Sequence, residues 1–104
     1  MKKILLSGLI MVNINAIDIC NEFHKHTQRI MQRYISYLDV TTDVDPIRGL
    51  NILRFEESLK ENYIFLKDTC YTSEDFKNTF DKAIGRSDKM IGVIYDKFTI
   101  KYNN

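Results

Sequence analysis

Apolar residues recur at spacings of three and four along three long stretches of the chain, which is the period of an amphipathic helix. The first stretch covers residues 17–38, the second runs from position 46 to about 69, and the third covers residues 72–100. With four Gly and one Pro, the chain has little material for turns. The pattern predicts an all-α fold, a small three-helix bundle in which an antiparallel helical hairpin is followed by a third helix.

One side of the first predicted helix is apolar and the other is charged. The apolar positions are Cys20, Phe23, Thr27, Ile30, Met31, Tyr34 and Leu38. The charged side carries three cations at four-residue intervals, Lys25, Arg29 and Arg33, which we call the basic ridge. A solvated helix face is the simpler interpretation. The alternative is a contact strip for an acidic protein partner or for anionic lipid headgroups.

The second predicted helix follows a turn at Asp45-Pro46, where Asp45 can cap the helix and Pro46 suits its first position. Its main apolar stripe comprises Ile52, Phe55, Leu59, Tyr63 and Leu66. A second apolar edge comprises Leu53 and Ile64. Glu56 is expected to pair with Lys60 one turn later. Phe65 projects away from both apolar edges, which predicts either an exposed anchor for a partner or a core residue.

The third predicted helix starts with Thr72 as its cap and Asp75 in the reciprocal position. Its apolar stripe is Phe76, Phe80, Ala83, Ile84, Ile91, Ile94 and Phe98. The stripe stays in phase past Gly85, so we expect one helix that ends near Thr99, followed by a frayed tail. Gly85 and Gly92 share a face away from the stripe, and each costs about 1 kcal/mol relative to Ala. They indicate either random variation of composition at exposed positions or a strip without side chains, where the backbone of another chain can approach closely.

The N-terminus has the three parts of a secretory signal peptide. Lys2 and Lys3 form a basic start, residues 4–12 are mostly apolar, and residues 13–16 give a polar break with a small residue at the cut. We therefore expect a signal peptide at 1–16 and a single helical domain at 17–104. The alternative is a retained anchor, although the apolar run is much shorter than the roughly 20 residues of a membrane span. After cleavage we expect no stable membrane insertion.

The two cysteines, Cys20 and Cys70, lie symmetrically about the predicted turn at position 45. An antiparallel hairpin brings such a pair side by side at its open end. In an oxidising compartment two cysteines most simply form one disulfide. Together with the N-terminal pattern, this predicts a periplasmic or secreted protein.

Composition and motifs narrow the expected function. Without Lys2 and Lys3 the chain has 13 basic and 14 acidic residues, so it lacks the basic footprint of a nucleic-acid-binding protein. Glu22, His24 and His26 could serve a metal or small-molecule carrier, but their spacing does not make a structural zinc site. No metal site, cofactor or catalytic constellation is predicted, and we do not expect an enzyme.

In its export signal, size and single disulfide, the chain resembles small helical envelope proteins of Gram-negative bacteria. These include inhibitors, immunity proteins and chaperones, and the resemblance implies a role in binding another protein. The expectation is an exported protein that occludes a target, with the basic ridge or the Gly85/Gly92 face as the favoured surface. The alternative is a membrane-anchored structural or accessory envelope protein that retains its N-terminal apolar segment.

Overall fold

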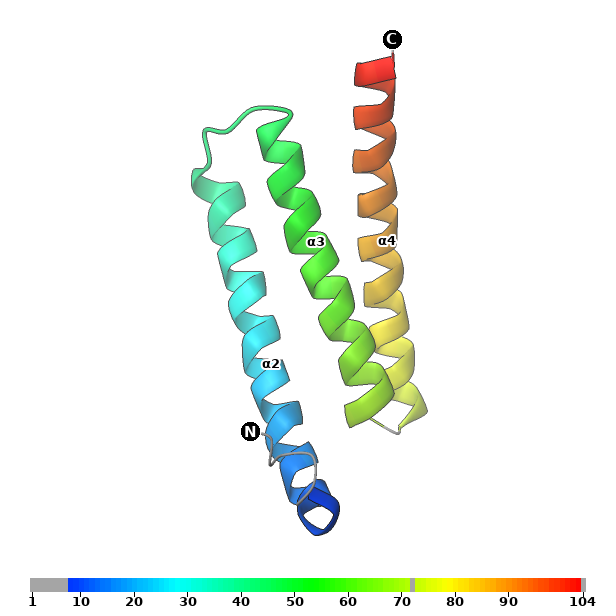
Figure 1. The fold of residues 1–104 in the computed structure, drawn as a ribbon. Helices are drawn as coiled ribbons and strands as arrows, with labels where there is room; N and C mark the ends of the chain where they lie inside the picture. The colour runs from blue at the N-terminus through cyan, green and yellow to red at the C-terminus, as the bar shows by residue number, and fades with distance from the viewer. Residues whose placement is uncertain (1–7, 72, 104) are drawn as a thin grey trace.

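The structure, a computed structural model, describes residues 8–71 and 73–103, with side chains described for 18–71 and 73–98. This part of the chain consists of helix α2 (Gly8–Val40), helix α3 (Ile47–Phe65), a turn of π-helix η1 (Leu66–Cys70) and helix α4 (Glu74–Asn103). Figure 1 shows α3 lying between α2 and α4, with each helix running opposite to the one before it. The prediction of an all-α fold with three helices is confirmed.

A disulfide closes the open end of the α2–α3 hairpin. Cys20 and Cys70 are bonded, and their Cα atoms lie 5.7 Å apart, which is an ordinary separation for a disulfide. The turn between the helices lies at the opposite end, where the Tyr37 hydroxyl donates to Asp43 at 2.9 Å. The predicted pairing of the two cysteines is therefore confirmed, and the hairpin is held at both ends.

The core is narrow and draws on all three helices. Its buried apolar side chains are Ile30 from α2, Leu53 and Leu59 from α3, Leu66 from η1 and Ile94 from α4. All but Leu53 belong to the main stripes predicted from spacing. Leu53 belongs to the predicted second edge of the middle helix, so that helix does bury two sides. Ile64, also predicted on that edge, is exposed instead.

The two sides of α3 are packed by different kinds of contact. Toward α2 the contacts are aromatic, with Phe65 stacked on Phe23 and Phe55 stacked on Tyr34. Toward α4 they include the ion pair of Lys60 with Asp88 at 2.5 Å, and Lys67 of η1 pairs with Asp81 of α4 at 2.7 Å. The predicted pairing of Glu56 with Lys60 is wrong, because Lys60 reaches across to α4 rather than along its own helix.

The helix ends differ from the sequence predictions. Helix α3 begins at Ile47, with Pro46 at its N-cap position and no side-chain cap from that residue, and Asp45 pairs with Lys97 of α4. Helix α4 passes through Gly85 unbroken, as predicted, but it continues to Asn103 rather than ending near Thr99. The sequence after Gly92 contains no Gly or Pro that would stop it. The predicted cap at Thr72 lies outside the described residues.

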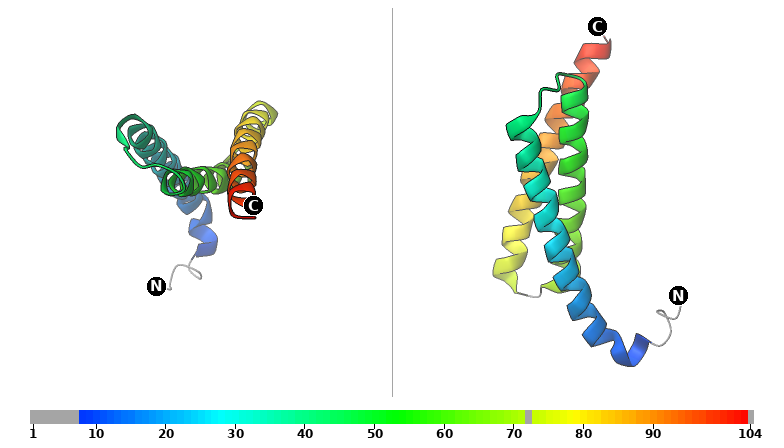
Figure 2. Two further views of the ribbon diagram at one scale, coloured as in Figure 1. Left: turned by 90° about the horizontal axis from the view of Figure 1, so that it is seen from above. Right: turned by 90° about the vertical axis from the view of Figure 1, so that its left-hand side faces the viewer.

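Helix α2 extends past the other two helices at its N-terminal end (Figure 2, right). It begins at Gly8 and runs without interruption through residues 13–16, where the sequence predicted a polar break before a helix starting at Ile17. The first seven residues of the predicted signal peptide lie outside the described residues. Within the described helices, no stretch is long and apolar enough to cross a membrane.

Seen along the helix axes, the three helices form a V. Helix α3 is at the vertex, and α2 and α4 are the two arms (Figure 2, left). Among the described residues, no Cα atom of α2 comes within 8 Å of a Cα atom of α4. The third helix thus packs against the middle helix but not against the first, and the two arms leave an open face between them.

Candidate protein-binding groove

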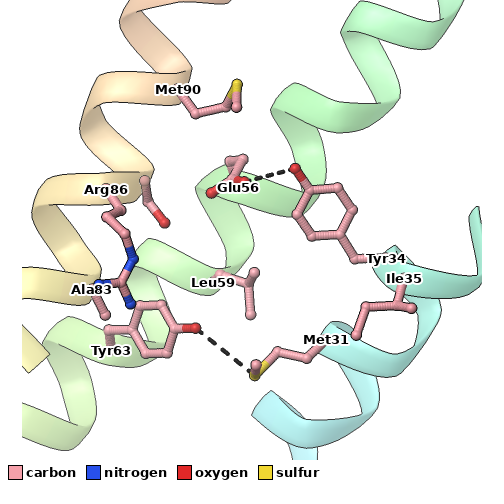
Figure 3. Close-up of a pocket in the computed structure, with 10 residues that line it drawn as sticks. Met31, Tyr34, Ile35, Glu56, Leu59, Tyr63, Ala83, Arg86 and Met90 are labelled. Carbon is pink, nitrogen blue, oxygen red and sulfur yellow. Dashed lines mark hydrogen bonds between the residues drawn. The ribbon is translucent and has the colours of Figure 1, made fainter. Parts of the chain in front are cut away.

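The open face of the V contains a groove of about 330 Å³ that is lined by all three helices. Figure 3 shows its walls: Met31 and Ile35 from α2 lie on one side, Ala83 and Met90 from α4 lie on the other, and Leu59 of α3 lies between them. The groove therefore runs over the middle helix, at about half its length.

The walls of the groove are apolar and exposed. The exposed fraction is 40% for Met31, 57% for Ile35 and 41% for Met90. Leu59 on the floor is buried, with 5% exposed, so the groove opens directly onto the core. Contiguous apolar surface of this kind is a common mark of a protein-binding site, whereas single exposed apolar residues are ordinary. Methionine is also typical of surfaces that adapt to different partners.

Five polar side chains of the described residues lie among these apolar walls, and one of them, Ser87, is buried. The Tyr34 hydroxyl donates a hydrogen bond of 2.7 Å to Glu56, and the Tyr63 hydroxyl lies 3.8 Å from the Met31 sulfur (Figure 3). Arg86 extends from α4, and no carboxylate oxygen of the described residues lies within 4.0 Å of its guanidinium nitrogens. The groove thus has one satisfied acidic group and one unpaired basic group.

The two tyrosines of the groove are held in their neutral form. Burial raises the pKa of the Tyr34 phenol far above its usual value, and the hydrogen bond to Glu56 and that carboxylate's charge raise it further. Burial also raises the pKa of Tyr63, with a further increase from the charge of Glu56 and an opposing effect from Arg86. Both hydroxyls therefore remain hydrogen-bond donors throughout the physiological pH range.

The basic ridge lies outside this groove. Lys25, Arg29 and Arg33 are exposed on α2, and Lys25 lies 3.8 Å from Glu22 one turn earlier. Arg29 and Arg33 border a shallow depression that also includes Tyr37. The structure thus places the three cations on an accessible face as expected, and their predicted role in binding a partner stays a prediction.

The other predicted surface residues have different environments. Gly85 and Gly92 are exposed, and a Cβ atom added at either would meet nothing within 4 Å. Their predicted exposed face is therefore present, although it does not border the groove. Phe65 is half-buried, with its ring centroid 3.9 Å from that of Phe23. This fits the alternative of a core residue rather than an exposed anchor.

The residues considered for a metal site point to different partners. His24 contacts the Tyr71 hydroxyl, Glu22 lies near Lys25, and His26 borders a depression between α2 and α3. Within the described residues, no three His, Cys, Asp or Glu side chains are grouped so that they could hold a metal ion. Glu22, His24 and His26 are thus not brought together.

The groove was not predicted from the sequence, although a signal for it exists. Ile35 and Met90 are apolar residues that fall outside the predicted stripes of their helices. Each widens the apolar arc of its helix toward the other arm of the V. Comparison of the chain with protein-family models, curated proteins and solved structures finds no match.

Proposed function

We propose that this chain is an exported helical protein that binds another protein by taking up one of its helices in the groove between α2 and α4. The observation that supports this most is the open V, which leaves apolar side chains of α2 and α4 exposed on one face, on either side of the buried Leu59 of α3. In this proposal the role is binding rather than catalysis, and a target would be blocked by occlusion of the helix that the groove holds.

The length of α3 is sufficient to support a helix as the occupant. Helix α3 has 19 residues and is therefore about 28 Å long, enough to support five turns of a second helix. An amphipathic helix presents anchors at i, i+4 and i+7, which suits walls separated by a floor residue such as Leu59. Such an occupant would lie against α3 as a fourth helix and cover the apolar walls of both arms.

Export is the second part of the proposal. The basic and apolar start of the sequence and the disulfide between Cys20 and Cys70 both support an oxidising compartment, periplasmic or extracellular. Cleavage after Ala16 would leave Cys20 within the first turn of the shortened helix. The intact mass of protein recovered from the cell envelope tests this part: a chain that begins at Met1 would contradict it.

A display library of amphipathic helical peptides, each about 20 residues long, tests the groove. Wild-type protein is expected to enrich binders from this library. These binders should have at least about tenfold lower affinity for the variants Ile35→Glu and Met90→Glu than for wild type, because a charge in an apolar wall is left unpaired on docking. Ile47→Glu is the matched control, since Ile47 is 56% exposed and does not line the groove.

Two outcomes would contradict the groove as the binding site. One is that no peptide binds; the other is that Ile47→Glu and Ile35→Glu weaken binding equally. If Arg29→Glu and Arg33→Glu abolish binding while the groove variants do not, the basic ridge is the binding surface instead.

A further inference from the structure

Arg86 is the one cation among the residues of the described chain that line the groove. Figure 3 shows its side chain reaching from α4 toward Tyr63 on the floor, and its charge acts on the Tyr63 phenol. Two of the carboxylates that α4 itself supplies are used elsewhere, since Asp81 and Asp88 pair with Lys67 and Lys60. Arg86 has no ion-pair partner among the described residues.

Glu56 is not an ion-pair partner of Arg86. Among the described residues that line the groove it is the only acidic one, and it accepts the 2.7 Å hydrogen bond from Tyr34 on the α2 side. Its oxygens lie more than 4.0 Å from the guanidinium nitrogens of Arg86. The groove therefore has a satisfied acid near one wall and an unpaired base at the other.

Any helix that fills the groove must cover Arg86 or lie beside it. Taking a guanidinium out of water without a partner is strongly unfavourable, whereas a bidentate pair with a carboxylate compensates for much of that cost. The apolar walls discriminate poorly among aliphatic side chains, particularly through Met31 and Met90. Charge at this one position is thus the feature of the groove best suited to select a partner.

We propose that the occupant of the groove is an amphipathic helix that carries an Asp or Glu at the edge of its apolar stripe, where it pairs with Arg86. This inference rests on the proposed function, and it adds the chemistry of the partner. A helix with a Lys or Arg at that position is excluded, because two unpaired cations would then be brought together in an apolar site.

The test uses a helical peptide from the display library in three versions, with Glu, Gln or Lys at the position nearest Arg86. Wild-type protein should bind the Glu version at least about tenfold more tightly than the Gln version, since a hydrogen-bonded charge pair replaces a neutral contact. Arg86→Gln should remove this preference, and Arg86→Glu should reverse it in favour of Lys. Arg54→Glu is the matched control, because Arg54 is exposed on α3 and borders a different depression.

The outcomes separate this inference from the proposal beneath it. If the Glu and Gln versions bind equally and both remain sensitive to Ile35→Glu, the role of Arg86 is refuted and the groove stands. If no version is sensitive to Ile35→Glu, the groove itself is refuted. If sedimentation shows that the wild-type chain self-associates, and Ile35→Glu abolishes this, the occupant is a second copy and the inference is overturned.

Discussion

Removal of the disulfide should cost this protein much of its stability without changing its native fold. The bond between Cys20 and Cys70 closes a loop with a sequence separation of 50. In the chain-entropy model a loop of that length lowers the entropy of the unfolded chain enough to stabilise the fold by about 4 kcal/mol. Because a domain of this size has about 5–15 kcal/mol of net stability, the loss is a large fraction of the total.

The assay is urea unfolding followed by circular dichroism, with wild type compared with the double variant Cys20→Ala/Cys70→Ala. A loss of about 4 kcal/mol corresponds to a fall in the unfolding midpoint on the order of 2 M urea for a small protein. The spectrum of the folded variant should match that of wild type, since the bond acts mainly on the unfolded chain. Wild type under reducing conditions is the control, because it frees the loop without any substitution.

The reasoning would be refuted if the free energy of unfolding fell by less than about 1 kcal/mol in both the variant and the reduced protein. Such a result would mean that the unfolded chain already holds the two cysteine segments close together. A variant whose m-value differs from that of wild type would instead indicate a change in the compactness of one of the two states, and the loop argument would then not apply.

Three further predictions concern single positions, all read out by urea unfolding. Gly85→Ala should stabilise the protein by about 1 kcal/mol through helix propensity. Gly49→Ala should give no such gain, because a Cβ atom at position 49 would lie 2.8 Å from the Phe98 ring. Equal gains in stability at both positions would contradict this packing. Tyr34→Phe should cost about 1–2 kcal/mol at neutral pH by removing the hydrogen bond to Glu56. The pKa of Tyr34 is higher in the folded state than in the unfolded state, so the stability that Tyr34 contributes is fully present below its unfolded pKa of about 10 and is lost above it. As the pH rises through that value, the free energy of unfolding should therefore fall less in Tyr34→Phe than in wild type. Parallel falls in the two proteins would refute this. Asn62→Leu should leave stability unchanged or raise it by about 1 kcal/mol, because the buried Asn62 Oδ1 has no hydrogen-bond partner; a loss above about 1 kcal/mol would indicate that this oxygen is satisfied.

Local spacing was sufficient to predict the helices and the pairing of the cysteines. The stripes of the three helices contain most of the buried residues, because helical period and burial are directly related. The predicted symmetry of Cys20 and Cys70 about the turn holds because the helical segments between each cysteine and the turn have similar lengths.

Contacts between distant residues could not be predicted in this way. Asp45 was assigned a local capping role, but its partner Lys97 lies 52 residues away. Phe65 was placed away from both apolar edges of its helix, but its ring stacks on Phe23 of α2. In both cases the two contacting residues are visible in the sequence, but how the helices cross decides which residue contacts which.

The groove was missed for a related reason. Periodicity describes each helix alone and does not say how many neighbours it has. An apolar arc wide enough for two neighbours predicts a closed bundle as readily as an open V. Ile35 and Met90 would complete the core of a closed bundle, and here they line an open face instead.

The different attachments of the two arms give the groove one fixed wall and one adjustable wall. Helix α2 is tied to α3 by the covalent bond between Cys20 and Cys70 and by the turn at the other end. Helix α4 lies outside that loop, and its contacts with α3 include partly exposed ion pairs such as Lys60 with Asp88. Salt screens pairs of this kind. The width of the groove should therefore respond to ionic strength through α4 alone, while the α2 wall keeps its position and sets the register of whatever binds.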